Sequence, residues 1–488
     1  MSQIIVIGSG FGSLASALRL RVGGHDVQVV ESSDKAGGKL GVHRSMGYRW
    51  DTGPSLFTMP HFIDELFKLF GEDPKEHFNY QKQSIICNYF WEDGTRFSSN
   101  ADLEVFCEEA AKTFDEPKDK IADYLATSDL KYDLTASLFL EKSLHKLSTF
   151  TSLQAAKAVL QMGKLDISST LNGVNEASFS NPKLIQFFNR FATYNGSSPY
   201  KTPGIMSMIP TLEMQFGTFY PKGGMRSIVE SLQQLGERNG VEFHFNEKVK
   251  SIDYTNQKIT GVTTEHAHYD ADIVVSGIDA FYTYTSLLPK LKAPKKTLEQ
   301  EKSSSAIIFY WGVKKSFPQL DLHNIFFSED YKQEFDAIFN LKKLATDSTI
   351  YLNISSKADK SDAPEGCENW FVMINVPTNN GQNWSQLVSE AKQQIITKLN
   401  RNLKVDLNKL IETEEVLDPV KIELKTSSHQ GSLYGSASNS KFSAFLRHPN
   451  FSNQIKGLYF CGGSVHPGGG IPLCLKSGQI VADLIAQA

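Results

Sequence analysis

The chain contains 488 residues, with 50 Lys or Arg against 54 Asp or Glu and a formal net charge of −4. A single hydrophobic core rarely serves a chain of this length, so we expect two packed domains. The near balance of charge argues against nucleic acid as a partner. Five cysteines, without any C-x-x-C spacing, predict neither a disulfide framework nor a metal site, and this usage is typical of the reducing cytoplasm.

The first ten residues, MSQIIVIGSG, predict a buried strand rather than a signal peptide, because no basic segment precedes the apolar run and glycines follow at once. No stretch reaches the roughly 18 to 20 consecutive apolar residues that span a bilayer. We therefore expect a protein that is not integral to the membrane, and peripheral attachment stays an open alternative.

Residues 3–31 predict a dinucleotide-binding unit of strand, tight turn, helix and second strand. Gly8 allows the chain to turn, and Gly10 lets the backbone approach a pyrophosphate. The helix expected from about Phe11 directs its N-terminal amide groups at that anion. This part of the sequence therefore predicts a nucleotide cofactor.

Two neighbouring positions and one acid complete the motif. Ser13 replaces the third glycine of the G-x-G-x-x-G pattern, but it is small enough to allow close packing of helix and strand, with Gly12 beside it. Glu31, at the end of the second strand, is expected to accept hydrogen bonds from the adenosine ribose. A chance glycine turn is the alternative, and the strand context and the spaced acid disfavour it.

A second glycine-rich stretch, residues 32–58, distinguishes between NAD and FAD. Gly37 and Gly38 allow close approach of the backbone, Lys39 can meet a phosphate, and residues 51–55 supply another turn. Nicotinamide dehydrogenases do not need this extension, so FAD is the predicted cofactor. The cofactor-binding residues predicted from this stretch are Gly38, Lys39, Gly53, Pro54 and Ser55.

Glu31 followed by KAGGKLG, together with the later WDTGPS, resembles the FAD-dependent carotenoid desaturase family, also called phytoene dehydrogenase-like, within the wider amine oxidase superfamily. The resemblance runs nearly from end to end. Residues 187–213 are similar to the signature of the subgroup that acts on hydroxylated or methoxylated acyclic carotenoid ends, most like the flavobacterial 3,4-desaturases of 1-hydroxycarotenoids. Residues 219–226 are similar to the family's return to the flavin domain, and residues 457–485 to its C-terminal flavin motif.

This resemblance implies an α/β fold, in which a Rossmann-like FAD-binding domain of the amine oxidase/GDI-like type carries an inserted α+β substrate domain. Residues 1–75, 216–280 and 426–488 are expected to form the FAD-binding domain. Residues 76–215 predict mostly helices with a hairpin at 85–99, and this segment is also expected to meet a membrane. Residues 281–425 predict the strands of the substrate domain's sheet.

The C-terminal run predicts a strand ending at Cys461, a glycine turn and a helix beginning near Ile471. That helix would direct its free amide groups at the flavin pyrimidine carbonyl, where negative charge gathers on reduction. Glycines 468–470 carry no side chains that would keep the ring away, although a surface loop is the alternative. From this run we predict that Gly463, Gly469, Gly470 and Ile471 bind the cofactor, and the family resemblance adds Val249.

The implied reaction sets the search for catalytic residues. Forming a double bond beside a polyene removes a hydride and a proton, and no side chain accepts a hydride. Flavin would take the hydride and leave an allylic cation, which then loses the proton. Glu213 and His466 are the candidate catalytic residues for that proton. A structural salt bridge is the alternative for Glu213, and shaping of the flavin pocket is the alternative for His466.

Two segments bear on the substrate. Tyr194, Asn195 and Ser198 lie among glycine and proline turns and are predicted to contact a terminal hydroxyl of the substrate. Turn residues that bond to their own backbone are the alternative, and the subgroup resemblance favours recognition. Residues 138–165 combine an apolar stripe with lysines, which is typical either of a helix at a membrane surface or of an ordinary surface helix.

The family resemblance thus implies FAD-dependent desaturation of an acyclic, 1-hydroxylated carotenoid, at the cytoplasmic face of the cell membrane. Quinone, oxygen or another carrier would reoxidise the flavin, and no second nucleotide-binding fold is predicted for a nicotinamide. A phytoene-type desaturase, a carotenoid isomerase and a non-catalytic prenyl-lipid escort protein of the same fold are the alternatives. Flavin motifs are generally degraded in escort proteins, and both motifs are present in this chain.

Overall fold

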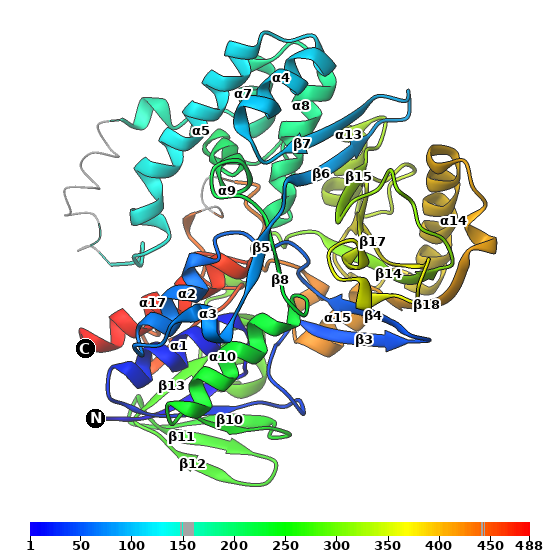
Figure 1. Cartoon of the computed structure of the whole chain (residues 1–488). Helices are drawn as coiled ribbons and strands as arrows, with labels where there is room; N and C mark the ends of the chain where they lie inside the picture. Colours follow the sequence, from blue (N-terminus) through cyan, green and yellow to red (C-terminus); the bar gives the residue numbers. More distant parts are fainter. Residues whose placement is uncertain (147–148, 150–160, 441–442, 444) are drawn as a thin grey trace.

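The computed structural model describes residues 1–146, 149, 161–440, 443 and 445–488. Figure 1 shows three regions: a sheet with its helices at the bottom, a group of helices at the top, and a second sheet with helix α14 on the right. Residues 147–148 and 150–160 of the segment 138–165 lie outside the described residues, so the contact of this segment with a membrane stays a prediction.

A five-stranded parallel sheet, in the order β19-β13-β1-β2-β9, forms the lower part of the molecule in Figure 1. Its strands are β1 (Gln3–Ile7), β2 (Asp26–Val30), β9 (Glu242–His244), β13 (Ile273–Ser276) and β19 (Leu458–Phe460). Strand β1 reads QIIVI and only its first residue is exposed. Such a nearly continuous apolar run is typical of a parallel strand that is covered on both faces.

Helices cover one face of this sheet and a small sheet covers the other. The helices are α1 (Phe11–Val22), α10 (Arg226–Arg238) and α17 (Ile471–Ala486), and the small sheet contains β10 (Val249–Thr255), β11 (Lys258–Thr264) and β12 (His268–Asp270). Ile4 and Val6 pack against α1 and α17, whereas Ile5 and Ile7 pack towards β10 and β11. This alternation follows from the two-residue period of a strand.

A seven-stranded mixed sheet, in the order β18-β14-β17-β16-β15-β6-β7, forms the second domain. Its strands are β6 (Ile85–Phe90), β7 (Arg96–Asn100), β14 (Ser305–Val313), β15 (His323–Phe326), β16 (Ile350–Asn353), β17 (Glu368–Val376) and β18 (Ile411–Leu417). Strands β6 and β15 pair in parallel, which joins the early hairpin to strands far along the chain. Helix α14 (Trp384–Leu403) packs on one face of the sheet, against Trp370, Val372 and Ile374.

The remaining elements complete the second domain and connect the two. The upper helices are α4 (Leu103–Phe114), α5 (Lys118–Phe139), α7 (Leu171–Ser178), α8 (Pro182–Asn189) and α9 (Pro210–Met214), with the short helices η3 (Arg190–Asn195) and η4 (Gly204–Met208). The smaller elements are α2 (His61–Lys68), α3 (Pro74–His77), α11 (Ala280–Tyr282), α12 (Lys295–Leu298), α13 (Tyr331–Asp336), α15 (Pro419–Thr426), and the pairs β3 (Gly41–Ser45) with β4 (Tyr48–Thr52) and β5 (Tyr80–Lys82) with β8 (Phe219–Pro221).

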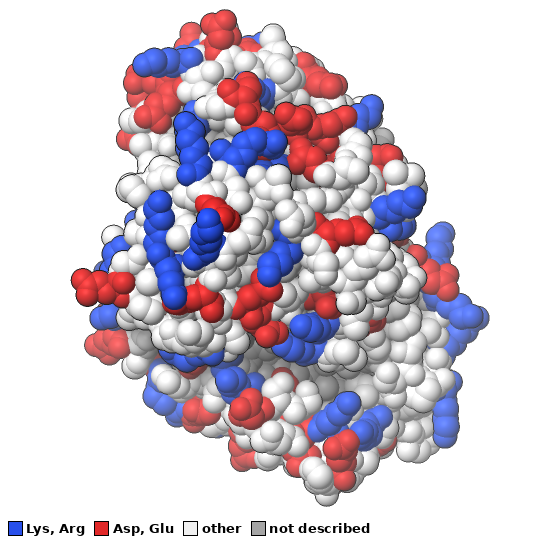
Figure 2. Space-filling model, turned by 90° about the vertical axis from the view of Figure 1, so that its right-hand side faces the viewer, with Lys and Arg blue, Asp and Glu red and all other residues white. Residues whose placement is uncertain are grey.

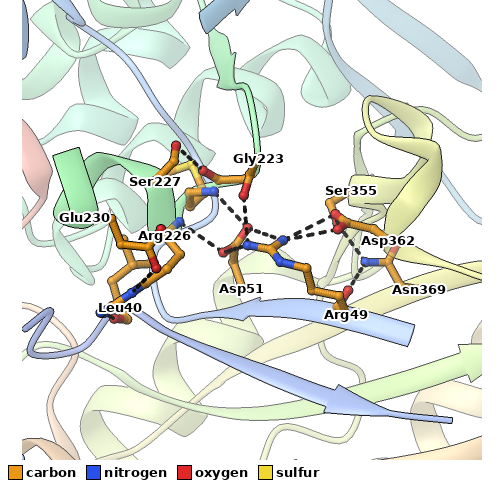
Figure 3. Close-up of polar contacts among 12 residues, drawn as sticks. Leu40, Arg49, Asp51, Gly223, Arg226, Ser227, Glu230, Ser355, Asp362 and Asn369 are labelled. Atoms are coloured by element: carbon orange, nitrogen blue, oxygen red, sulfur yellow. Dashed lines mark hydrogen bonds and ion pairs between the residues drawn. The ribbon is translucent and has the colours of Figure 1, made fainter. Parts of the chain in front are cut away.

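A buried polar network ties the end of β4 to both domains (Figure 3). Asp51 accepts hydrogen bonds from the backbone N–H groups of Met225 (2.8 Å) and Arg226 (3.1 Å), where α10 begins. Arg49 donates to Asp51 through Nη2 (2.8 Å) and to Asp362 through Nη1 (3.2 Å). The turn that follows Asp51 is therefore held between α10 and the second sheet.

Several elements agree with the sequence analysis. The predicted hairpin at 85–99 and the predicted helix from Ile471 are confirmed. Among the described residues, no helix combines the length and the apolar character that crossing a bilayer requires. On the face drawn in Figure 2, basic and acidic side chains are interspersed, as the nearly balanced composition suggests.

Candidate active site

One cavity of about 970 Å³ lies between the two domains. Every residue that the sequence predicts to bind the cofactor lines this cavity, from the first glycine turn to the start of α17. The cavity continues along the second sheet, where Ile325, Phe371 and Met373 present mostly apolar side chains. The fold thus brings the separate sequence motifs to one site, although their contacts with a cofactor stay a prediction.

The N-terminus of α1 is the first wall of the site. Gly8 has φ of +85°, a conformation that favours glycine, and it forms the turn between β1 and α1. A Cβ at Gly10 would have no atom within 4 Å, so this position faces open space. The N-cap residue Gly10 provides no side-chain cap, and the first turn carries no acid. The free N–H groups and the helix dipole therefore favour an anion at this point.

Glu31 is fully engaged by hydrogen bonds within the protein. Its Oε2 accepts from the backbone N–H (2.8 Å) and the hydroxyl (2.6 Å) of Ser9, and its Oε1 accepts from Ser33 N–H (2.9 Å) and the Ser32 hydroxyl (3.2 Å). A carboxylate has about four lone-pair sites, and all are occupied. A ribose hydroxyl would therefore have to displace one of the two serine hydroxyls. Val249 lines the cavity in the same region. It follows Glu247 by two residues, and Glu247 N–H donates to Glu31 O (2.9 Å).

The second glycine-rich stretch packs directly on the first. A Cβ at Gly38 would lie 3.2 Å from Gly10 Cα, and a Cβ at Gly53 would lie 2.3 Å from Lys39 O. Lys39 Nζ donates to the backbone oxygens of Leu433 (2.7 Å) and Ser432 (3.3 Å). Desolvation lowers the pKa of Lys39, while nearby Asp279 acts in the opposite direction. The ammonium group is thus held at the cavity wall by carbonyl groups.

The C-terminal glycines have different reasons for being glycine. A Cβ at Gly468 would lie 3.1 Å from Arg447 Cζ, and a Cβ at Gly469 would lie 2.8 Å from Tyr434 Cα. Only Gly470, with φ of +109°, has no atom within 4 Å of its Cβ position. It precedes α17, which has no side-chain cap and no acid in its first turn. All three glycines were expected to leave room for a ring, but of the three only Gly470 has open space at its Cβ position.

Two of the predicted residues do not line the cavity. His466 is buried against Phe139, and its Nε2 lies 2.9 Å from Lys142 O. Burial lowers the pKa of His466 to about 4, so the ring is neutral at physiological pH. Ser198 is buried in a turn, where its N–H donates to Asn439 Oδ1 (2.8 Å) and its backbone oxygen accepts from Thr202. Within the described residues, the structure gives neither side chain access to a ligand in the cavity.

Glu213 does line the cavity, and it is held there by Arg190 and Tyr194. Arg190 Nη2 donates to Glu213 Oε2 (2.5 Å), and the Tyr194 hydroxyl donates to Oε1. Burial raises the pKa of Glu213, and the charge of Arg190 opposes this rise. The Arg190 guanidinium also lies 4.2 Å from the centroid of the Phe191 ring, in a cation–π arrangement. The salt bridge predicted as the alternative for Glu213 is therefore present.

Asn195 also lines the cavity, next to Tyr194. Its Nδ2 donates to Ser438 Oγ (3.3 Å), and its Oδ1 is buried without a partner in the described part of the chain. The side chain is thus held by one hydrogen bond and keeps one unused acceptor.

Several polar residues of the cavity wall have no clear signal in the sequence, among them Arg190, His323, Tyr351 and Arg447. Arg190 interrupts the apolar run FFNRF, and a charge in such a run is the one signal that was available. Arg447 is 3% exposed and forms no ion pair among the described residues, and no Asp or Glu occurs outside them. Burial lowers the pKa of Arg447 to about 10. A buried cation without an acid is costly unless a ligand supplies the negative charge.

These features fit FAD. The N-termini of α1 and α17 both lie at the cavity with free N–H groups. Gly10 and Gly470 leave open space beside these N-termini, and Arg447 adds an uncompensated positive charge. Such a set suits a ligand that carries phosphates and a ring that gains negative charge.

Comparisons with known proteins give the family. Residues 14–486 match the family model of flavin-containing amine oxidoreductases. The chain is 59% identical over 485 residues to the 1-hydroxycarotenoid 3,4-desaturase of Flavobacterium sp. (strain P99-3), covering 99% of each chain. It is 32% identical to the 4,4'-diapolycopene oxygenase of Methylomonas sp, over 99% of this chain and 98% of that protein.

Solved structures agree on the fold. Wild-type putrescine oxidase bound to putrescine superposes with a TM-score of 0.64 at 13% identity, covering 100% of this chain and 99% of that one. At this identity the likeness shows the fold alone, which is the α/β flavoprotein fold of the amine oxidase type. Family and fold together make the chain an oxidoreductase with FAD as its cofactor. The chain therefore belongs to the flavin-containing amine oxidoreductase family and, within it, to the carotenoid desaturases.

Proposed function

We propose that this enzyme introduces a carbon–carbon double bond into the end of an acyclic carotenoid that carries a 1-hydroxyl group. The observation that carries the proposal is the cavity between the domains, in which the predicted flavin motifs open onto the largely apolar face of the second sheet. The 59% identity to a 1-hydroxycarotenoid 3,4-desaturase supports the same substrate class.

Bound FAD supplies a hydride acceptor, and the chain has to hold the polyene in line and exclude water. Apolar side chains from both parts line the cavity, namely Ile325, Phe371 and Met373 from the second sheet and Ile209 and Leu212 from the helical region. Burial of an apolar chain against such side chains is favoured by about 25 cal/mol per Å². The cavity wall therefore contributes binding and alignment rather than bond-making groups.

For the proton that leaves the substrate, Glu213 is our candidate acceptor. Its carboxylate lines the cavity, and burial raises its pKa, which makes a carboxylate a stronger base. Arg190 and Tyr194 fix its orientation, so that the same contacts that form the salt bridge also position the carboxylate.

The proposal is tested with purified, FAD-loaded protein under anaerobic conditions. A 1-hydroxylated acyclic carotenoid is expected to bleach the flavin absorbance and to yield a product with a longer-wavelength absorption maximum and a mass lower by two hydrogens. Conversion without added conjugation would indicate an isomerase. Equal conversion of the unsubstituted carotenoid would indicate a phytoene-type desaturase. Flavin that stays oxidised with every carotenoid contradicts the proposal.

We further propose that the substrate is taken up from the inner face of the cell membrane and that quinone or oxygen reoxidises the flavin. A water-insoluble polyene has to come from a lipid phase, which supports peripheral association. Co-sedimentation with vesicles of anionic lipid checks the first point. Reoxidation rates with a soluble quinone and with oxygen check the second.

A further inference from the structure

His323 is a polar residue on the largely apolar cavity face of the second sheet, where Tyr351 also lies. Strand β15 alternates, so that His323 and Ile325 line the cavity while Phe326 packs in the core behind the sheet. On strand β17, which β16 separates from β15, Phe371 and Met373 line the same cavity. A histidine in this row needs a polar partner, because an unpaired polar group in an apolar wall costs free energy.

The ring nitrogens of His323 have different surroundings. Nδ1 lies 2.9 Å from the Tyr351 hydroxyl and 3.2 Å from Asn353 Nδ2. Asn353 Nδ2 also donates to Leu322 O (3.0 Å), which fixes the orientation of that amide. An amide nitrogen only donates, so Nδ1 is the acceptor and the ring proton is on Nε2.

His323 is neutral and its N–H is unused. The side chain is 3% exposed, and burial, with a smaller effect of Arg190, lowers the pKa of His323 to about 3. In the described part of the chain, Nε2 has no hydrogen-bond partner. The side chain that lines the cavity thus carries a neutral, unsatisfied donor, which suits an uncharged oxygen rather than an anion.

Hydrogen bonds place this donor beside the predicted flavin-binding turn. The Tyr351 hydroxyl contacts both His323 Nδ1 and Ser55 Oγ (2.8 Å), and Ser55 belongs to the turn after β4. In a 1-hydroxylated substrate that reacts at C3 and C4, the oxygen-bearing carbon is separated from C3 by a single carbon. The group that recognises this oxygen must therefore lie close to the reacting carbons, and the Tyr351 hydroxyl links His323 to Ser55 in the predicted flavin-binding turn.

Arg190 is another donor of the cavity wall, and it is less suited to the task. Its guanidinium is neutralised by Glu213 and packs against the aromatic rings of Phe191 and Tyr89. Although Arg190 Nε also lacks a partner among the described residues, it belongs to a group whose charge is already balanced.

We propose that His323 is the specificity-determining residue of the enzyme, and that its Nε2–H donates a hydrogen bond to the oxygen on C1 of the carotenoid. The inference rests on the proposed function and extends it to the recognition of the hydroxyl. Tyr351 and Asn353 are positioning residues, because they hold Nδ1 and so fix the tautomer and the plane of the ring.

The test compares two amide variants, His323→Gln and His323→Asn. The Gln side chain can carry an N–H at the distance of Nε2, whereas the Asn side chain reaches only the position of Nδ1 and leaves Nε2 unreplaced. For each protein, kcat/KM and the anaerobic rate of flavin reduction are measured with a 1-hydroxylated acyclic carotenoid and with the same carotenoid lacking the hydroxyl. FAD content and Tm are recorded to compare folding.

Wild type is expected to prefer the hydroxylated substrate by about tenfold, the size of effect that one hydrogen bond supports. His323→Gln should retain most of this preference, and His323→Asn should lose it. Ile325→Val, on the same strand, should change kcat/KM for both substrates by the same factor. The inference is overturned if His323→Asn keeps the preference for the hydroxylated substrate. It is also overturned if the wild-type enzyme converts both substrates without a preference. Wild type that converts neither substrate instead contradicts the proposed function.

Discussion

Replacing Gly10 by alanine separates cofactor binding from folding more sharply than any other change in the site. Gly10 has φ of −73° and ψ of 177°, which alanine adopts without strain, and no atom lies within 4 Å of the added Cβ. The unfolding free energy of the protein without ligand should therefore stay equal or rise by about 0.4 to 1 kcal/mol. A methyl group where a pyrophosphate approaches should cost about 1 to 3 kcal/mol of binding, or roughly 5- to 150-fold in Kd.

The assay is a series of thermal unfolding curves at increasing FAD concentration, because a ligand that binds only the folded state raises Tm. Gly10→Ala should need roughly 5- to 150-fold more FAD than wild type for the same rise in Tm. Gly12→Ala is the matched control, since its Cβ would lie 2.7 Å from Gly462 N and 2.9 Å from Gly462 Cα. That variant should lose about 1 to 3 kcal/mol of stability at every FAD concentration. Gly10→Ala that responds to FAD like wild type would refute our placement of the pyrophosphate.

Three further predictions concern buried ionisable groups. Asp51→Asn should lower the unfolding free energy by about 3 kcal/mol in urea titrations, because Arg49 and the start of α10 lose their anionic partner. His466 has a folded pKa of about 4 against 6.5 when unfolded, so only the unfolded state binds its proton between these values. Stability should fall by about 3 kcal/mol as pH drops from 6.5 to 4, and His466→Gln should flatten that decline at matched pH. Glu213→Gln should retain FAD yet slow formation of the desaturated product at least tenfold in anaerobic single turnovers, because proton loss follows hydride transfer, and an unchanged rate of product formation excludes Glu213 as the proton acceptor.

The first wall of the site could be predicted from the sequence because its signals are local. Gly8, Gly10 and Glu31 belong to one strand-turn-helix-strand unit, whose spacing alone places a turn beside a helix N-terminus. The helix from Ile471 was predictable for the same reason, because a glycine turn directly precedes it and Pro472 lies in its first turn.

The opposite wall could not be predicted, because it depends on strand order. His323 meets Tyr351 because β15 and β16 are neighbours in the sheet. Parallel pairing of β6 with β15 brings the early hairpin beside these strands. Neither pairing has a local signature, and a histidine at the start of a four-residue strand is indistinguishable in sequence from one in a loop. The polar wall therefore becomes visible only in three dimensions.

Glycine shows a second limit of the sequence. Gly469 and Gly470 are neighbours in one motif, yet a Cβ at the first would meet Tyr434 and a Cβ at the second would meet open space. A missing side chain makes room, but the sequence does not say whether protein or ligand fills it. The sequence also does not say where the ring of His466 lies. This residue belongs to the predicted cofactor motif, yet its ring packs on Phe139 outside the cavity.

The distribution of charge divides the cavity into two parts with different requirements. Towards the start of α17, Arg447 is a positive group without an acidic partner in the described residues. The free N–H groups at the N-terminus of α17 add to the positive electrostatic potential there. Along the second sheet, the charge of Arg190 is cancelled by Glu213, and His323 is neutral. A ligand that gains negative charge is therefore favoured only at the first end. At the second end a charged substrate would find no counter-charge, whereas an apolar chain with one neutral oxygen would satisfy the free donor of His323.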